Sequence, residues 1–262
     1  MNVFKQIVKP EDGSAWITGA SGGIGRATAL RLARDGWTVF ATARGADDLE
    51  ALASESDGPG RIVPLPADVT DPDAMNACMA RILETGPLAL AILNAGIYTP
   101  MRAQGFDAAT ARRMFDVNLG GVANALDPVL KHMIGRRGGH VALTASVAGY
   151  RGLPDASAYS ATKAGLIAMA EALAMDLVDL GVRISVINPG FVETDATSVN
   201  EFEMPFLMTP DEAAKRIVTG LAQPGFEIAF PRRFAWMLRL IGLLPNQLYF
   251  KALRWMTGWG KK

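Results

Sequence analysis

Short apolar runs alternate with longer helical patterns along most of this 262-residue chain. The runs have the length of strands and are predicted at Ala15 to Thr18, Thr38 to Ala43, Ile62 to Ala67, Leu88 to Leu93, His140 to Ser146, Arg183 to Asn188 and Glu227 to Phe230. Helices are predicted at Gly25 to Asp35, Asp71 to Thr85, Ala108 to Leu130, Ser157 to Leu180 and Pro210 to Ala222. Strands that are apolar throughout and alternate with helices are typical of a parallel sheet buried between helices. We therefore predict an α/β fold, with one doubly wound parallel sheet of about seven strands and helices on both faces.

No linker, repeat or low-complexity segment interrupts this pattern. The length allows one large core. We predict a single domain over residues 1–262, with its core at about residues 13–230 and an apolar, basic helical extension at residues 231–262.

The balance of charges excludes a strong electrostatic field around the whole molecule. The chain has 26 basic and 26 acidic side chains, so its balance does not favour nucleic acid or an anionic surface as a partner of the whole molecule. One cysteine, Cys78, excludes an intrachain disulfide and fits a reducing cytosol. Met1 to Lys5 lack the apolar region of a signal peptide, and no run of 18 apolar residues follows. We predict a cytoplasmic protein.

The residues that most often bind transition metals are scarce. Only His132 and His140 accompany Cys78, and they form no cluster with ligand spacing. We predict no metal site, structural or surface roles for both histidines, and an apolar helix face for Cys78.

A glycine-rich turn, Thr18 to Gly25, joins the first predicted strand to the first predicted helix. Glycines allow a sharp turn and a close approach to a pyrophosphate, and the helix N-terminus offers free N–H groups. The alternative is a plain tight turn, but the strand before it and the helix after it favour dinucleotide binding in a Rossmann-type fold. The candidate binding residues here are Gly19, Ser21, Gly22, Gly23, Ile24 and Gly25.

Tyr159 and Lys163 are four residues apart in a predicted helix, and Ser146 lies 13 residues upstream of the tyrosine. Residues four apart share one helix face, so a fixed ammonium beside the phenol would favour the phenolate and make Tyr159 an acid or base. Ser146 could then hold a substrate oxygen. The alternative is that the pair is simply a solvated helix face.

Several further motifs occur in a consistent order. Thr-Gly-x-x-x-Gly-x-Gly at Thr18 to Gly25 and Tyr-x-x-x-Lys at Tyr159 to Lys163 resemble those of the short-chain dehydrogenase/reductase family. The resemblance runs from about Ala15 to Phe230 and also includes Asp68-Val69, Asn94-Ala95-Gly96, Asn118, Ser146 and the segment Pro189-Gly190 to Thr194.

This resemblance implies an oxidoreductase that acts on CH–OH groups with NADP or NAD. It implies that Tyr159 is the acid/base, that Lys163 lowers its pKa and contacts the nicotinamide ribose, that Ser146 holds the substrate oxygen and that Asn118 supports a water chain. Asn118 could instead satisfy backbone groups, and Ser157 or Ser160 could replace Ser146. The further cofactor contacts that it implies are Asp68, Val69, Asn94, Ala95, Gly96, Tyr159, Lys163, Pro189, Gly190, Val192 and Thr194.

The end of the second predicted strand bears on the choice of dinucleotide. An acidic residue there favours NAD because it binds the ribose 2′-OH, but this chain has Ala43 followed by Arg44. A guanidinium suits a 2′-phosphate, so we predict NADP(H) in preference to NAD(H). Three alternatives stay open. Arg44 could be a solvated loop charge, and Asp47 or Asp48, which lie close in sequence, could supply the acidic residue that favours NAD. Arg26 could either assist Arg44 or lie on the surface.

The family places substrate beside a segment that corresponds to Asp195 to Met208. Apolar residues are frequent there and in nearby loops, so we predict a small hydrophobic alcohol, aldehyde or ketone. The alternative is packing on the core or on a neighbouring subunit. The candidates are Ile97, Tyr98, Val147, Tyr150, Leu153, Phe191, Phe202, Met204, Phe206, Leu207 and Met208.

Residues 231–262 combine three tryptophans with seven basic residues and no Asp or Glu. Such a segment can lie in a membrane interface, cover the substrate pocket or form a subunit contact. Peripheral contact at the inner membrane surface is therefore one expectation, and the resemblance implies a homodimer or homotetramer. Two alternatives to an enzyme stay open: a dinucleotide-binding regulatory protein and a lipid-handling protein at a membrane surface.

Overall fold

The computed structural model describes residues 7–199 and 204–258. Seven parallel strands form one sheet in the order β3-β2-β1-β4-β5-β6-β7. The strands are β1 Ser14–Thr18, β2 Thr38–Ala43, β3 Arg61–Pro66, β4 Leu88–Leu93, β5 His140–Thr144, β6 Arg183–Pro189 and β7 Glu227–Phe230. The predicted fold class is confirmed.

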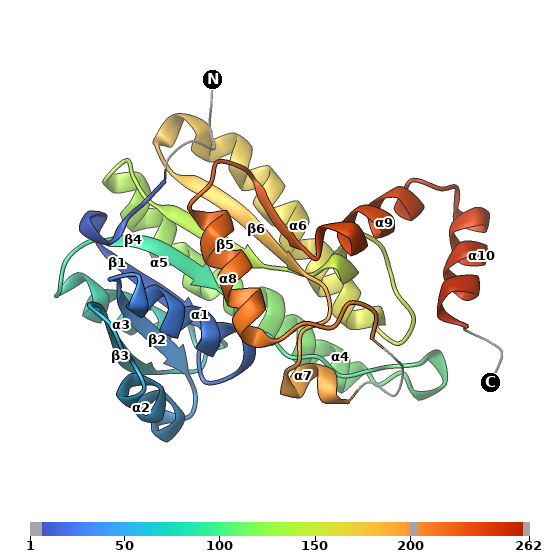
Figure 1. Ribbon diagram of the computed structural model, residues 1–262, viewed down its shortest axis with the longest axis horizontal. Coiled ribbons are helices and arrows are strands. Elements are labelled where there is room, and N and C mark those ends of the chain that lie inside the picture. The colour runs from blue at the N-terminus through green and yellow to red at the C-terminus, as the bar shows by residue number, and fades with distance from the viewer. Residues whose placement is uncertain (1–6, 200–203, 259–262) are drawn as a thin grey trace.

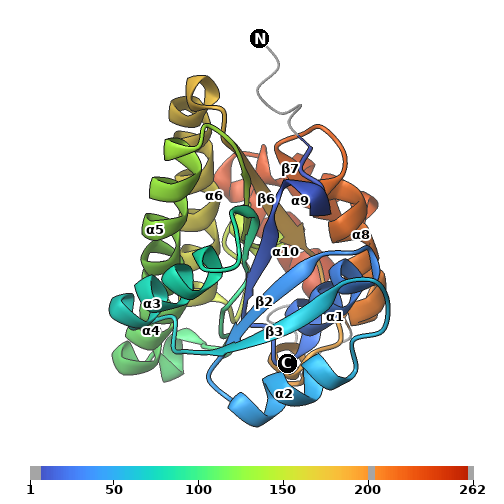
Figure 2. The ribbon, with the colours of Figure 1, turned by 90° about the vertical axis from the view of Figure 1, so that its left-hand side faces the viewer.

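The helices cover both faces of the sheet (Figures 1 and 2). Side chains of α1, α2 and α8 pack in the core on one face, and those of α3, α5 and α6 pack on the other. The helices are α1 Gly23–Arg34, α2 Ala46–Ser54, α3 Pro72–Leu83, α4 Ala108–Phe115, α5 Gly121–Gly135, α6 Ser157–Leu177, α7 Asp195–Ser198, α8 Pro210–Leu221, α9 Arg232–Gly242 and α10 Asn246–Thr257. No helix within the described ranges has the length and apolar character needed to cross a bilayer.

The strand order reverses beside β1. The chain runs outward from β1 to β3 and then returns to place β4 on the other side of β1. The carboxyl ends of β1 and β4 therefore form a switch point, where open α/β sheets bind ligands. The central strands β1, β4, β5 and β6 are buried along their whole length, which explains why apolar residues predominate in them.

Several predicted boundaries need correction. β5 ends at Thr144 rather than Ser146, because Ser146 caps a short 3₁₀ turn, Val147–Gly149, and accepts a hydrogen bond from the Ala148 amide. The helix predicted from Ala108 to Leu130 is divided by a π-helical turn, Asp116–Gly120. Two helices that the sequence pattern did not indicate, α2 and α7, lie in loops after β2 and β6. Short amphipathic segments of this kind give a weak periodic signal.

Two helix ends have clear local causes. Asp71 caps α3, and its carboxylate accepts hydrogen bonds from the Asp73 and Ala74 amides. Gly181 ends the segment after α6 with φ at +72°, in the left-handed region that glycine adopts readily.

Candidate active site

The glycine turn between β1 and α1 fits against the end of β4. Gly19 has a φ of +68°, and a Cβ on it would lie 2.7 Å from the Ala95 Cα. A Cβ on Gly25 would lie 2.1 Å from the Gly19 carbonyl oxygen. These two positions therefore require glycine for packing. Gly22 is different, because no atom lies within 4 Å of its Cβ position and it caps α1 without a side chain. The turn thus leaves open space at the N-terminus of α1, which is the environment that a phosphate needs.

Asn94 ties this turn to the sheet. Its side-chain amide donates to the carbonyls of Thr18 and Gly19, each at 3.2 Å. The Thr18 hydroxyl in turn accepts from the Asn94 and Ala95 amides at 3.0 and 3.1 Å. Asn94 is therefore a clamp between β1 and β4, and it positions the turn.

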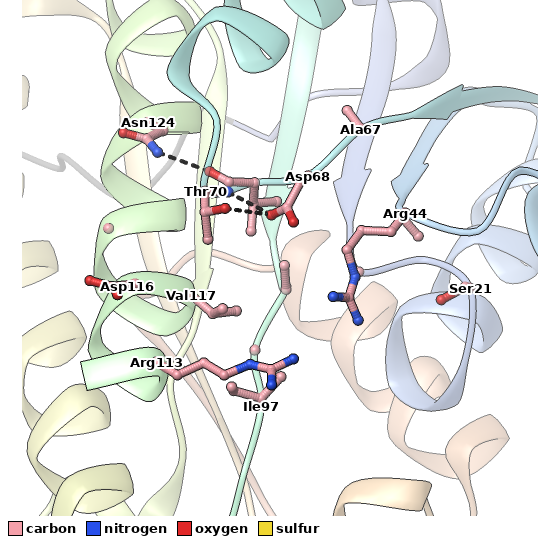
Figure 3. A pocket seen from close by; sticks show the side chains of 16 residues that line it. Ser21, Arg44, Ala67, Asp68, Thr70, Ile97, Arg113, Asp116, Val117 and Asn124 are labelled. Atoms are coloured by element: carbon pink, nitrogen blue, oxygen red, sulfur yellow. Dashed lines mark hydrogen bonds between the residues drawn. The ribbon is translucent and has the colours of Figure 1, made fainter. Parts of the chain in front are cut away.

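A cleft of about 670 Å³ opens at the switch point (Figure 3). The predicted cofactor residues that line it are Gly19, Ser21, Arg44, Asp68, Val69, Ala95 and Gly96. Asp68 accepts hydrogen bonds from the Thr70 amide and hydroxyl at 2.9 and 2.8 Å. These bonds, with smaller contributions from Arg44 and Arg113, lower the pKa of the Asp68 carboxyl. It is therefore ionised at neutral pH.

The remaining predicted cofactor residues do not line the cleft, and several of them lie around the turn. A Cβ on Gly23 would lie 2.7 Å from the Thr194 Cγ2, so the segment after β6 closes against the glycine turn. Gly190 donates to the Phe230 carbonyl at 2.7 Å, and the Val192 side chain is buried. Ile24 packs against the core beneath the turn. The structure thus brings both motifs together.

Arg113 also lines the cleft, and the sequence motifs did not indicate it. Figure 3 shows the guanidinium groups of Arg44 and Arg113 pointing into the same space from opposite sides. Arg113 follows Arg112 in α4, and adjacent helix residues differ in direction by about 100°. Only the packing of α4 decides which of the two faces the cleft. The other lining residues that the motifs did not indicate are Ala43, Ala67, Thr70, Ile97, Asp116, Val117, Gly120 and Asn124.

The alternative charges near Arg44 lie elsewhere. Asp47 and Asp48 belong to the first turn of α2 and are not among the residues that line the cleft. Arg26 forms an ion pair with Glu55, so the alternative of a surface role explains this residue. Arg44 is therefore the cation from this group that faces the cleft.

Tyr159, Lys163 and Ser146 come together at the carboxyl ends of β5 and β6. Ser146 is close enough to the Tyr159 hydroxyl to lower its pKa. The Ser146 hydroxyl itself donates to the Pro189 carbonyl at 3.4 Å and accepts from the Ala148 amide at 3.1 Å. The Lys163 ammonium lies 5.5 Å from the centroid of the Tyr159 ring and donates to the Thr144 carbonyl at 2.8 Å. Ser160, an alternative candidate, instead accepts a hydrogen bond from the Leu153 amide.

The pKa of Tyr159 moves opposite to the prediction made from spacing. Burial raises it to about 12, while Ser146 lowers it less strongly. Burial also lowers the pKa of Lys163 to about 8. Desolvation of the phenol therefore dominates its pKa, and the expected lowering by Lys163 does not contribute. Tyr159 is protonated at neutral pH in this structure.

Asn118 lies in the π-helical turn and is fully buried. Its side chain accepts from the Ile97 amide at 2.8 Å and donates to the Ile97 carbonyl and the Thr162 hydroxyl at 3.0 and 3.1 Å. A Cβ on Gly96 would lie 3.3 Å from Asn118 Oδ1 and 3.4 Å from Lys163 Nζ. Gly96 thus allows these side chains to approach the cleft, and π-helical turns are frequent at functional sites.

Aromatic side chains form a wall near Gly190, where Phe234 of α9 lies 3.1 Å from the Cβ position of that glycine. Phe234 packs at 5.8 and 5.9 Å from Phe191 and Phe206. Tyr98 lies apart from this group and packs edge-on against the Tyr159 ring at 4.9 Å. The inner face of α9 also packs with Val147 and Tyr150. Met208 instead pairs with Val192 and is buried in the core, and Phe202 lies outside the described residues.

The histidines and the cysteine lie away from this site. His140 begins β5 and shares a hydrogen bond of 2.9 Å with Ser185, whereas His132 accepts from the amide of Leu88, the first residue of β4. Both are at the amino ends of the strands, opposite the cleft. Cys78 is buried in α3.

Comparisons with known proteins agree with this geometry. Residues 14–203 match the family model for short chain dehydrogenases. An uncharacterised oxidoreductase of Myxococcus xanthus is 40% identical over 243 residues, which span 92% of this chain and 96% of that protein.

Two solved structures share 28% of their sequence with this chain. An alcohol dehydrogenase from Thermococcus sibiricus, complexed with 5-hydroxy-NADP, has a TM-score of 0.76 over 83% of this chain and 95% of its own. A 3-oxoacyl-[acyl-carrier protein] reductase from Brucella melitensis, with bound NAD, has a TM-score of 0.74 over 85% and 91%. This chain belongs to the short-chain dehydrogenase/reductase family of oxidoreductases.

Proposed function

We propose that the protein interconverts a hydrophobic alcohol and its aldehyde or ketone, with NADP(H) preferred to NAD(H) and Tyr159 as the acid/base. The observation that carries this proposal is the Lys163 ammonium, which lies 5.5 Å from the Tyr159 ring centroid and 3.4 Å from the Cβ position of Gly96 in the cleft lining. Ser146 is the hydroxyl that acts on the same phenol. A proton donor, a hydroxyl partner and a positive charge are then available to one reacting oxygen.

The raised pKa gives Tyr159 a defined role. A phenol that is protonated at neutral pH can donate its proton to a carbonyl oxygen, and Ser146 can hold that oxygen by a hydrogen bond. Lys163, with a pKa of about 8, is largely cationic at neutral pH and stabilises the phenolate that proton transfer leaves. When bound, the nicotinamide supplies the hydride.

The cleft fits a dinucleotide. Open space at Gly22 accepts the pyrophosphate, and Asp68 and Val69 provide the wall expected near adenine. Arg44 and Arg113 face the cleft, and Ala43 stands where a carboxylate would repel a 2′-phosphate. The Thermococcus and Brucella structures contain an NADP derivative and NAD respectively, so the preference for NADP(H) rests on these two arginines.

The aromatic wall of Phe191 and Phe234, and the Tyr98 ring beside Tyr159, support the proposal of an apolar substrate. A suitable panel contains hydrophobic aldehydes, cyclic ketones and, because of the Brucella relative, a 3-oxoacyl thioester. Consumption of NADPH and NADH is measured for each compound.

Tyr159→Phe tests the mechanism, because it removes the hydroxyl and keeps the ring. We expect turnover to fall by about 10²–10⁴-fold while NADPH still binds. Tyr98→Phe is the matched control, since it removes the hydroxyl of the neighbouring ring, and it should retain activity within a few-fold. Full activity in Tyr159→Phe would overturn the assignment. NADPH binding by the wild type without turnover of any compound would favour a regulatory protein instead.

Oligomeric state and location stay predictions. We expect a homodimer or homotetramer in the cytoplasm, formed through α4, α5 and α6. Light scattering of the purified chain measures the assembly, and cell fractionation measures the location.

A further inference from the structure

The helix α9 has two apolar faces. Phe234, Ala235 and Leu238 form the inner face and are buried against the wall of the candidate site. Trp236, Leu240 and Leu243 follow the spacing i, i+4, i+7 on the outer face and are exposed by 62, 59 and 82%. The inner face accounts for the packing of α9 on the protein. The outer face is a second apolar stripe with no such role.

The next helix, α10, repeats this arrangement. Tyr249 and Leu253 are buried, whereas Leu248 and Trp255 lie seven residues apart and are exposed by 51 and 83%. We name α9, α10 and their connecting turn, residues 243–245, the C-terminal helix pair. Figure 1 shows α10 at the periphery of the molecule, far from the sheet.

The charge of this region has one sign. Residues 231–262 contain no Asp or Glu, although the whole chain has a net charge of zero. Arg232 and Arg233 flank the outer stripe of α9, and Lys251 lies on α10; all three are exposed and form no ion pair within the described part of the chain. An apolar stripe with basic neighbours complements a partner surface that has an apolar interior and negatively charged groups at its boundary with water.

The helix pair is fixed to the protein by polar contacts. Arg151 donates to the carbonyls of Gly242 and Leu244 at 2.7 and 2.8 Å, and its guanidinium lies 4.0 Å from the Tyr249 ring centroid. The Tyr249 hydroxyl donates to the Gly152 carbonyl at 2.7 Å. These contacts join the helix pair to the loop between Ser146 and Tyr159.

We propose that the C-terminal helix pair docks on the surface of an anionic phospholipid bilayer. Trp236, Leu240 and Leu243 enter the boundary between headgroups and acyl chains, and the neighbouring basic side chains contact lipid phosphates. Helices of 11 and 12 residues are too short to span a bilayer and lie in its plane. Docking places the apolar wall of the candidate site close to the lipid.

A second copy of this chain fits the same surface less well. A two-fold interface brings the same patch of both copies together, so basic residues would face basic residues with no carboxylate from this segment between them. The cores of protein interfaces are also poor in charge. An anionic bilayer can contact both groups, because its acyl chains accept the apolar stripe and its phosphates pair with the basic side chains.

Vesicle flotation of the full chain tests the proposal. We expect binding to vesicles of phosphatidylcholine with phosphatidylglycerol, weaker binding to phosphatidylcholine alone, and a decrease with added salt. Leu240→Glu should lower the partition coefficient about tenfold or more, whereas Leu83→Glu, at an exposed position of α3, should not change it. Lys251→Glu should lower it about five- to tenfold, and Lys215→Glu on α8 is its control.

Three results would overturn the proposal: absence of the full chain from floating anionic vesicles, equal binding by Leu240→Glu and Leu83→Glu, or equal binding by Lys251→Glu and Lys215→Glu. If light scattering shows that Leu240→Glu dissociates an oligomer that does not float, this surface contacts a second copy instead. Circular dichroism confirms the fold of each variant, and the substituted side chains are all exposed.

Discussion

The glycine turn and the C-terminal helix pair border the same candidate site, but different interactions hold them. The turn is fixed by backbone groups of buried strands, through Asn94 and Thr18, with no space for a Cβ at Gly25. The helix pair is fixed by side chains: the buried inner face of α9, Arg151, Tyr249 and the ion pair of Arg239 with Glu227. A change at a packed position of the turn, such as Gly25, must therefore disturb the sheet, whereas a change at the helix pair can remain local.

The largest effect is expected at Gly25. In Gly25→Ala the new Cβ would meet the Gly19 carbonyl oxygen at 2.1 Å, so the turn must shift. We expect a loss of about 3 kcal/mol or more in the free energy of unfolding, and loss of NADPH binding. Denaturant unfolding and a binding titration measure the two.

Gly22→Ala is the matched variant. Its Cβ enters open space and its φ of −154° suits any residue, so only the modest preference for glycine at an N-cap is lost and stability should fall by no more than about 1 kcal/mol. The same Cβ occupies the space proposed for the pyrophosphate, and NADPH affinity should fall. A stable Gly25→Ala or an unfolded Gly22→Ala would contradict this description of the turn.

Arg44 tests the cofactor side without disturbing the fold, because its side chain is exposed in the cleft. Arg44→Ala should lower kcat/KM for NADPH about 10- to 100-fold, the effect of losing a charge-assisted contact to phosphate, and leave NADH nearly unchanged. Arg113→Ala should act in the same direction. An unchanged ratio of NADPH to NADH efficiency in both variants would remove the arginines from this role.

Arg151 tests the other region. Arg151→Ala removes two hydrogen bonds to the turn of the helix pair and the contact with Tyr249, which together contribute about 1–3 kcal/mol locally. Amide hydrogen exchange in α10 should accelerate, while that in β1 should not. Arg216→Ala, on the exposed face of α8, is the control. Equal acceleration in β1 would show that the helix pair and the sheet unfold together.

The smallest expected effect is a pH dependence of the free energy of unfolding, caused by His140 in the sheet. Burial and the charge of Arg183 hold the pKa of His140 well below its usual value. As pH falls below about 6.5, His140 therefore takes up a proton in the unfolded chain but not in the folded one. The contribution of His140 to the free energy of unfolding is complete above that pH and decreases below it. The slope is at most about 1.4 kcal/mol per pH unit. Unfolding free energies between about pH 5 and 7.5 measure the slope. His140→Gln should flatten it, whereas an unchanged slope would assign the effect to other groups.

Much of the fold follows from local pattern. The unbroken apolar run at Leu88–Leu93 predicted the bounds of β4, because a strand buried on both faces excludes polar residues until it ends. The π-helical turn at Asn118 was not predictable in the same way. The sequence on both sides of this turn is compatible with a regular α-helix. In the π-helical turn, the Asn118 side chain instead forms hydrogen bonds with Ile97 and Thr162, which lie far away in sequence.

The sequence by itself determined which chemical groups are available at the site: a phenol and an amine one helical turn apart, a serine, and glycines where a phosphate can approach. Chemical identity and short spacing are local properties. Only the tertiary structure decided that Arg113 rather than Arg112 faces the cleft, that α9 closes the wall, and that burial raises the pKa of Tyr159. These properties depend on which distant segments exclude water from each group, and no pattern along the chain contains that information.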